Sequence, residues 1–270
     1  MTVQNYVKSF EDRMLTSGYA ETSVESYSNY LSRFLRFMSA FGELGVFDPA
    51  SARLFLRSIS CFKSRSIARS ALKYFFENCI DLPEIMEDVP AIRLKQAMPT
   101  VLSRVEVRNV IDQAANCKEL AIISVLYTTG VRAAELRSIK VTDIQLDRSA
   151  ILIDYGKGGK SRFVPVSQHL RVLLLDYLRA YKPVDYLFPG EYSDSISASA
   201  LKRLVRRLGS QAGVENLHPH ILRHCCATHL LESGVSLHSI QKILGHSDIR
   251  TTERYVMCAT DDYRSIPELL

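Results

Sequence analysis

The sequence lacks any run of about 18 or more apolar residues, the length that a helix needs to span a bilayer. Its first residues carry acids early and contain no apolar segment, so we expect no signal peptide. Internal repeats and low-complexity segments are also missing. These absences argue against a membrane or secreted protein and favour a cytoplasmic one.

The cysteines form no CxxC pair and follow no regular spacing. Two of them are neighbours in a helical pattern, and adjacent cysteines rarely form a disulfide with each other. We therefore expect reduced, mostly buried thiols, as in a cytoplasmic protein. The six positions are Cys61, Cys79, Cys117, Cys225, Cys226 and Cys258.

The chain does contain enough apolar sequence for a sizeable core. Of its 270 residues, 47% are hydrophobic and 23% are charged, which is typical of a soluble globular protein with one large domain or two ordinary ones. The formal net charge of +5 and the pI near 8.8 are compatible with an anionic partner but do not identify it.

Residues 1–92 are predicted to be all helical. Apolar residues recur there at helical spacing, and we expect four or five helices between the breaks. The spacing is clearest at Leu31, Phe34, Leu35 and Met38, and the breaks fall at Gly18, at residues 42–49 and at Pro83. Residues 93–100 show no periodicity and are predicted to be a linker.

Residues 101–270 are predicted to form a mixed domain. Ser103 begins a helix expected to reach Asn116, with the acid three residues after Ser103 completing a capping box. More helices follow, interrupted by two strand-like segments, 150–155 and 162–166, with a glycine-rich tip between them. The predicted fold class is therefore mainly α with a small β-hairpin or sheet (α+β).

The segment HPHILRH has a proline suited to the first turn of a helix. His220 and Arg223 then lie three residues apart and share a face. A bidentate arginine beside a histidine suits a phosphate oxyanion, although an isolated pair of this kind is more often a surface arginine and a satisfied histidine. A zinc site at His220 and His224 is disfavoured, because an arginine lies between them and the glutamate of HExxH is missing.

Two further cations stand next to glycines. Arg132 follows TTGV and begins a short helix, where an arginine more commonly pairs with an acid such as Glu135 or remains in water. Lys157 lies in GKGGK at the tip of the predicted hairpin. A turn lysine is usually solvated, but a flexible tip also suits the delivery of an ammonium group into a groove.

Taken in order, these residues together with His246 and Tyr255 resemble the tyrosine recombinase (phage integrase) family, most closely its Xer-type members and their plasmid and phage relatives. The resemblance rests on the blocks TTGVRAAEL, GKGGKSRFVPV, HPHILRHCCATHLLESG and ILGHSDIRTTERYV. It covers the second domain from Ser103 onwards. It implies an N-terminal helical core-binding (SAM-like) domain and a C-terminal catalytic domain.

The resemblance implies that Tyr255 is the nucleophile. A phenol with a pKa of about 10 attacks poorly at neutral pH until it is deprotonated or oriented. His220 is implied to assist the removal of its proton or to hydrogen-bond the phosphate. Lys157 is implied to protonate the departing 5′ oxygen as a general acid.

The other catalytic residues are implied to neutralise the phosphate. Arg132 and Arg223 are expected to hold the non-bridging oxygens, and His246 to donate a hydrogen bond to one of them. The sequence has no acidic cluster spaced to hold Mg²⁺, so the positive charge is expected from side chains. The covalent intermediate keeps the energy of the broken bond, so neither a metal, ATP nor another cofactor is expected.

Two basic helices are predicted to contact DNA phosphates. The alternative for each is an ordinary solvated face. One helix carries Lys63, Arg65, Arg69 and Lys73, and the other carries Lys202, Arg203, Arg206 and Arg207.

The resemblance implies a site-specific recombinase that acts on a double-stranded DNA site through a 3′-phosphotyrosyl intermediate. It implies a homotetramer, or a heterotetramer with a related recombinase, accessory DNA-bending proteins as further partners, and no membrane. Dimer resolution, integration and inversion stay open as the biological role. The alternatives are a DNA-binding regulator with the same fold that does not cleave, and a type IB topoisomerase-like relaxing enzyme. The compact helical N-terminal domain and the chain length favour a recombinase.

Overall fold

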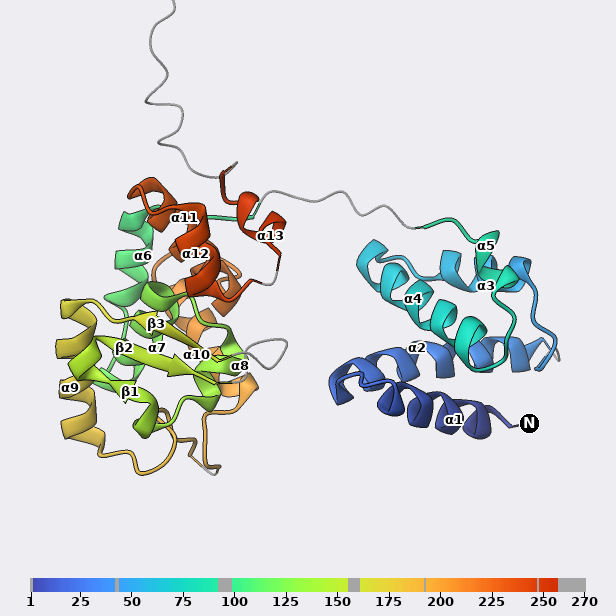
Figure 1. The fold of residues 1–270 in the computed structure, drawn as a ribbon, viewed down its shortest axis with the longest axis horizontal. Coiled ribbons are helices and arrows are strands. Elements are labelled where there is room, and N and C mark those ends of the chain that lie inside the picture. Colours follow the sequence, from blue (N-terminus) through green and yellow to red (C-terminus); the bar gives the residue numbers. More distant parts are fainter. Residues whose placement is uncertain are drawn as a thin grey trace, which may run out of the picture. The chain divides into compact units, whose positions relative to one another are not determined.

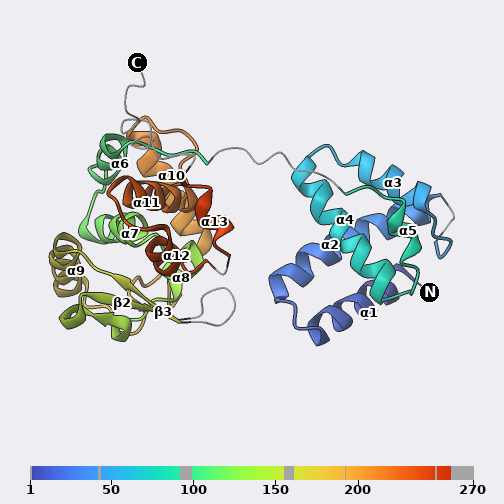
Figure 2. The ribbon, with the colours of Figure 1, turned by 45° about the horizontal axis from the view of Figure 1, so that its top comes forward.

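In the computed structural model the chain divides into two compact units, residues 1–96 and 97–270 (Figure 1 and Figure 2). The described residues are 2–41, 44–91, 99–154, 161–191, 193–246 and 248–256. The predicted linker, 93–100, falls outside them except for Pro99 and Thr100. The predicted hairpin tip with Lys157 also lies outside the described residues.

The first unit is helical in the part that the structure describes, in agreement with the periodicity. Its elements are α1 (Val3–Thr16), α2 (Glu21–Ala40), α3 (Pro49–Ser58), α4 (Phe62–Asn78) and α5 (Glu84–Glu87). Leu31, Phe34 and Leu35 on α2 are fully buried and share one core with Phe10 of α1 and Phe75 of α4. Burial of these aromatic and aliphatic side chains is the main force that holds the helices together.

Local signals explain where several helices begin. The Asp48 carboxylate caps α3 by accepting a hydrogen bond from the Ala50 N–H at 2.7 Å, and Pro49 occupies the first turn. Ser103 caps α6 and forms the predicted capping box with Glu106. In this box the Glu106 N–H donates to the Ser103 hydroxyl at 3.2 Å, and the Ser103 N–H donates to the Glu106 carboxylate at 2.7 Å.

The second unit is built around α7, which is buried on nearly all sides and contacts α9 and α11. The helices of this unit are α6 (Arg104–Ile111), α7 (Cys117–Thr129), α8 (Ala133–Ser138), α9 (Gln168–Tyr181), α10 (Ala198–Gln211), α11 (Pro219–Glu232), α12 (Leu237–Leu244) and α13 (Arg250–Glu253). Two short 3₁₀ turns, η1 (Val141–Asp143) and η2 (Leu146–Arg148), flank the first strand. The fold is mainly α with a small sheet, as predicted.

The sheet differs from the predicted hairpin. Strand β2 (Ala150–Ile153) pairs antiparallel with β3 (Arg162–Pro165), but it also pairs with a third strand, β1 (Ile144–Gln145). Two residues are too few to show the alternation that marks a strand, so the sequence did not suggest β1.

The predicted helix ending at Asn116 is also too long. Helix α6 ends at Ile111, and Asn116 instead caps the next helix by accepting a hydrogen bond from the Glu119 N–H at 3.0 Å. A residue that caps one helix in an extended conformation cannot continue the helix before it.

The described cysteines are all free, but the prediction that most are buried is wrong. Among them only Cys225 and Cys226 are buried, and Cys61 is exposed because it precedes the first turn of α4 at the surface. Cys258 lies outside the described residues. None of the described helices has the length and apolar character that crossing a membrane requires.

Candidate active site

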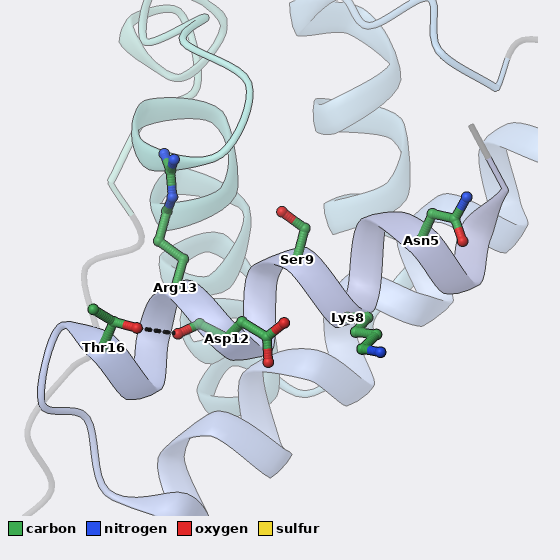
Figure 3. Close-up of a pocket in the computed structure, with 6 residues that line it drawn as sticks. All are labelled: Asn5, Lys8, Ser9, Asp12, Arg13 and Thr16. Carbon is green, nitrogen blue, oxygen red and sulfur yellow. Dashed lines mark hydrogen bonds between the residues drawn. The ribbon is translucent and has the colours of Figure 1, made fainter.

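The first unit carries a polar hollow along α1 (Figure 3). Its lining side chains are Asn5, Lys8, Ser9, Asp12, Arg13 and Thr16. The Thr16 hydroxyl donates to the backbone carbonyl of Asp12 at 2.8 Å. Both signs of charge are present, and none of these six side chains belongs to a predicted site.

The predicted basic stripe of α4 is only partly available to a ligand. Arg65 donates two hydrogen bonds to the Ile59 carbonyl oxygen, at 2.9 and 2.6 Å. Arg69 donates in the same way to the backbone carbonyls that follow α5. These two guanidinium groups therefore fasten neighbouring segments to α4, while Lys63 and Lys73 are exposed. DNA contact by this stripe stays a prediction.

In the second unit, Arg132 is placed by a glycine turn. Gly130 ends α7 with a φ of +62°, a conformation that strongly favours glycine. A methyl group at this position would lie 2.6 Å from a Leu244 methyl group and 3.1 Å from the Cys226 sulfur. The close approach brings the end of α7 against the end of α12, with Arg132 directly before α8.

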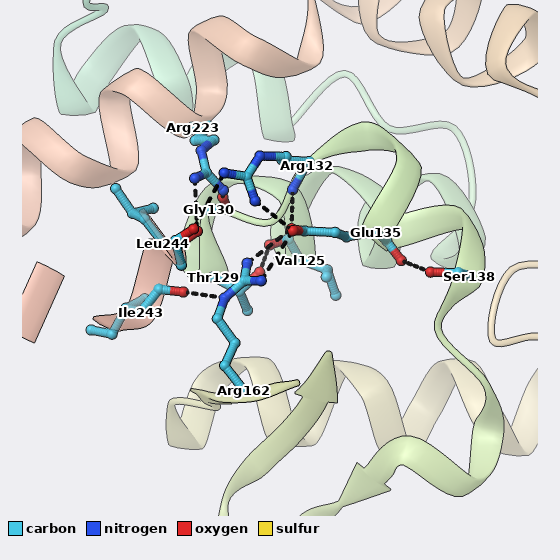
Figure 4. A network of polar contacts seen from close by, with 11 residues as sticks. Val125, Thr129, Gly130, Arg132, Glu135, Ser138, Arg162, Arg223, Ile243 and Leu244 are labelled. Atoms are coloured by element: carbon cyan, nitrogen blue, oxygen red, sulfur yellow. Dashed lines mark hydrogen bonds and ion pairs between the residues drawn. The ribbon is translucent and has the colours of Figure 1, made fainter. Parts of the chain in front are cut away.

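The buried carboxylate of Glu135 joins two arginines (Figure 4). Arg132 Nη1 donates to it at 2.7 Å, and Arg162 Nη1 and Nη2 donate to it at 3.0 and 2.8 Å. Burial alone would raise the pKa of Glu135, but the hydrogen bonds from Arg162 and Arg132 outweigh it and bring this pKa down to about 2. Glu135 is therefore ionised at neutral pH and fixes the direction of the Arg132 side chain.

Arg223 is the most deeply buried charged side chain of this group, with 1% exposure. It donates to the Gly130 carbonyl at 2.6 Å and to the Leu244 carbonyl at 2.7 Å. Burial, and then the nearby charge of Arg132, lower the pKa of Arg223 to about 10, so it remains cationic at neutral pH. Two backbone carbonyls at helix ends thus hold a buried positive charge in one geometry.

His246 follows the glycine that ends α12. Its Nδ1 lies 2.9 Å from the Thr252 hydroxyl. Burial, followed by the charges of Arg223 and Arg132, lowers the pKa of His246 to about 4, so its ring is neutral at pH 7. When the Thr252 hydroxyl donates to Nδ1, the ring proton stays on Nε2 as a hydrogen-bond donor.

Tyr255 lies just beyond the end of α13 and is 3% exposed. Its ring packs in a small cluster with Ile240 and Leu244, and it stacks nearly parallel to the His246 ring, with 6.3 Å between centroids. Its hydroxyl lies 3.0 Å from Nδ1 of His224. The aromatic ring is thus part of a core, while its polar end belongs to a hydrogen-bonded group.

These side chains surround one pocket of about 130 Å³. It is lined by Pro99, Arg132, His220, Arg223, His224, His246, Thr251, Arg254 and Tyr255. The structure therefore brings together every predicted catalytic residue that it describes, from the start of α8, from α11 and from the segment after α12. The sixth, Lys157, lies outside the described residues.

A neighbouring pocket links this site to α10. Its lining includes Arg132, His220 and Lys202. Lys202, Arg203, Arg206 and Arg207 are all exposed, and Arg207 also forms an ion pair with Glu119 of α7. The structure thus places Lys202 of the predicted basic helix beside the pocket that Tyr255 lines, and Arg207 against α7.

Sequence reasoning missed part of the site. Arg162 looked like an ordinary residue at the start of a strand, and no local pattern marks its pairing with Glu135. Arg254 and Thr251 stand beside Tyr255 in the sequence, and that proximity was their only signal. For His224 the sequence offers only the disfavoured zinc site with His220. In the part of the chain that the structure describes, no group of three or more His, Cys, Asp and Glu side chains is arranged to hold a metal ion.

One known protein family matches the part of the chain that forms this pocket. Residues 100–261, which include all of its lining except Pro99, match the model of the phage integrase family. The chain belongs to this family of tyrosine recombinases.

Similar proteins span nearly the whole chain. The tyrosine recombinase XerA of Pyrococcus horikoshii is 30% identical over 97% of this chain and 92% of its own length. The tyrosine recombinase XerC of Staphylococcus aureus is 29% identical over 92% of this chain and 90% of its own length. A crystal structure of the XerH site-specific recombinase bound to a palindromic difH substrate matches with a TM-score of 0.76 at 22% identity, covering 89% of this chain and 78% of that one. The last similarity shows the shared fold.

Proposed function

We propose that the protein is a site-specific tyrosine recombinase that cuts and rejoins duplex DNA through Tyr255. One observation carries the proposal: Arg132, Arg223, His220 and His246 line the same pocket as the Tyr255 side chain. Membership of the family and the Xer relatives, which are named as tyrosine recombinases, support it.

The positive charges of the pocket suit a phosphodiester that is being cleaved. The scissile phosphate is an anion and gains negative charge in its five-coordinate transition state. Arg223 is buried and Arg132 is oriented by Glu135, so their charges are fixed before the substrate arrives. Preorganised charge of this kind in a water-poor site lowers a barrier more than mobile charge in water does. His246, neutral at pH 7, contributes a donor rather than a charge.

In the proposed cleavage step Tyr255 attacks the scissile phosphodiester. The Tyr255 O–H bond breaks and its proton passes to a base in the pocket, while the phenolic oxygen bonds to phosphorus and the bond from phosphorus to the 5′ oxygen breaks. The leaving oxygen takes a proton from a general acid, for which the resemblance proposes Lys157. The product is a 3′-phosphotyrosyl link, and attack on it by another 5′ hydroxyl reverses the step. Because each step exchanges one phosphodiester for another, neither ATP nor a metal ion is required by the proposal.

The proposed partner is a double-stranded recombination site. The exposed basic residues of α10 next to the pocket support contact with its phosphates. The proposed working form is a tetramer on two sites, either of this chain alone or with a related recombinase.

A suicide substrate tests the proposal. A duplex carrying the recombination site, with a nick just beyond the scissile phosphate, loses its short leaving strand after cleavage and traps the covalent product. The wild-type chain is expected to give a protein–DNA adduct on a denaturing gel, and Tyr255→Phe is expected to bind the same DNA without forming it. DNA binding with no adduct from the wild-type chain would support a non-cleaving regulator and refute the proposal.

A further inference from the structure

His224 is a half-buried titratable group to which the proposed mechanism gives no role. It follows Arg223 on α11, and its Nδ1 lies 3.0 Å from the Tyr255 hydroxyl oxygen. The two rings are 5.5 Å apart between centroids, at an angle of 53°. This distance is that of a direct hydrogen bond to the atom that is proposed to attack phosphorus.

Packing against neighbouring side chains holds both His224 and Tyr255 in position. The ring of His220, one helical turn earlier on α11, packs edge-on against it with 4.6 Å between centroids. Tyr255 itself is held by the apolar cluster that includes Ile240 and Leu244. Packing therefore opposes a rotation of the Tyr255 side chain, and its hydroxyl stays within hydrogen-bonding distance of His224.

Burial and nearby charges keep His224 unprotonated at neutral pH, as a base that accepts a proton from Tyr255 must be. Burial, followed by the charges of His220, Arg254 and Arg223, lowers the pKa of His224 to about 4. A neutral imidazole nitrogen is free to accept a hydrogen bond and then a proton. A phosphodiester in the pocket brings a negative charge that opposes these cations, so its arrival raises the affinity of His224 for a proton.

We propose that His224 accepts the proton of the Tyr255 hydroxyl when Tyr255 attacks the phosphodiester. This inference rests on the proposed recombinase function and adds a catalytic residue to it. The O–H bond of Tyr255 breaks, the proton moves to Nδ1 of His224, and the phenolic oxygen bonds to phosphorus while the 5′ oxygen leaves and is protonated by the general acid. On rejoining, the proton returns from His224 to the tyrosine. His220 is then left to hydrogen-bond the phosphate.

The first test replaces His224 with phenylalanine, which fills a similar volume and accepts no proton. The same helix offers a matched control, because Nδ1 of His229 lies 2.8 Å from the hydroxyl of Tyr127, outside the pocket. Single-turnover adduct formation on the suicide substrate is expected to slow by about 100-fold or more in His224→Phe. His229→Phe is expected to stay within a few-fold of wild type when rates are normalised to folded protein. DNA affinity is measured for all three.

The second test asks whether a proton is transferred or only a position held. Without His224 the proton of Tyr255 passes to water or hydroxide, so the rate should rise with pH, by about tenfold per pH unit while the phenol is mostly protonated. The ratio of wild-type to His224→Phe rates between pH 7.5 and 9 is therefore expected to fall about tenfold per unit. Taking the ratio cancels titrations common to both proteins, such as that of the general acid. The titratable and charged groups that face His224 are His218, at the start of α11, His220 and Arg223 on α11, and Arg254 and Tyr255 after α13.

Several outcomes overturn the inference. These are a His224→Phe rate equal to or above wild type, a rate ratio that does not change with pH, or a wild-type rate in His224→Asn, whose side chain accepts a hydrogen bond but no proton at neutral pH. His224→Asn also serves where the phenylalanine variant fails to fold, and it is expected to be as slow. A wild-type chain that forms no adduct refutes the recombinase function itself, which distinguishes the two failures.

Discussion

Replacing Glu135 with glutamine removes the negative charge that joins Arg132 to Arg162 without changing the size of the side chain. Glu135 is 4% exposed, and its two partners donate to it at 2.7 to 3.0 Å. The variant leaves Arg132 and Arg162 next to the buried Arg223 without the carboxylate that pairs with both. Removing one member of a buried ion pair typically destabilises a protein by about 3–5 kcal/mol.

The pKa of Glu135 gives the same magnitude. Its fall from the ordinary value of 4.5 to about 2 corresponds to about 3 kcal/mol of extra stability for the ionised form in the folded state. Because the folded pKa is the lower one, this stability is present above pH 4.5 and is lost as the pH falls towards 2. The difference between wild type and Glu135→Gln should therefore be largest at neutral pH and shrink through this acidic range.

Thermal and urea unfolding of the full chain measure the effect. For a unit the size of residues 97–270, about 3 kcal/mol corresponds to a fall in Tm of about 6–12 °C at pH 7. Glu119→Gln is the matched control, since Glu119 pairs with Arg207 at a more exposed position and should change stability by about 1 kcal/mol or less. If Glu135→Gln proves no more destabilising than Glu119→Gln, the Glu135 pair does not organise the site as described.

Three further results are expected. Gly130→Ala should lower the free energy of unfolding by about 1–3 kcal/mol in urea titrations, because φ is +62° and the new methyl group would lie 2.6 Å from Leu244; an unchanged midpoint would contradict this. The free energy of unfolding should fall between pH 7 and 5 by about 1–2 kcal/mol for each of His224 and His246. Both have a pKa of about 4 in the folded protein, whereas in the unfolded chain a histidine is protonated already near pH 6.5, so acid favours the unfolded state. A His246→Asn variant should be less sensitive to acid. Lys202→Ala should reduce the salt dependence of DNA binding by about one counterion, as expected for one lost phosphate contact, and Arg207→Ala, whose guanidinium pairs within the protein, should leave it nearly unchanged.

Much of the fold follows from local patterns in the sequence. Leu31, Phe34 and Leu35 recur at helical spacing, and the structure buries all three on one side of α2. The two-residue strand β1 was missed, because its pairing with β2 depends on a partner and not on its own residues. The start of α6 was predicted correctly, because its cap, Ser103, is visible in the sequence. The predicted end of α6 was wrong, because Asn116 was not recognised as the cap of α7.

The candidate site also contains residues that the sequence predicts and others that only the fold brings together. The residues that the structure brings to the pocket were predicted through motifs whose order resembles a known family, and not through their separate properties. Arg162 meets Glu135 across 27 positions of sequence, and His224 meets Tyr255 across 31. Contacts over such separations are made by the fold, so they have no local signal in the sequence. They orient Arg132 and place the proposed proton acceptor beside Tyr255, which the motifs alone do not describe.

The most direct measurement of the central claim locates the covalent bond. The trapped adduct is digested with nuclease and trypsin, and the modified peptide is sequenced by mass spectrometry. Cleavage after Arg254 gives a peptide that also contains Tyr263, so fragmentation must separate the two tyrosines. The account predicts a nucleotide joined by a 3′-phosphate to Tyr255; a nucleotide on Tyr263 or on any other residue would contradict it.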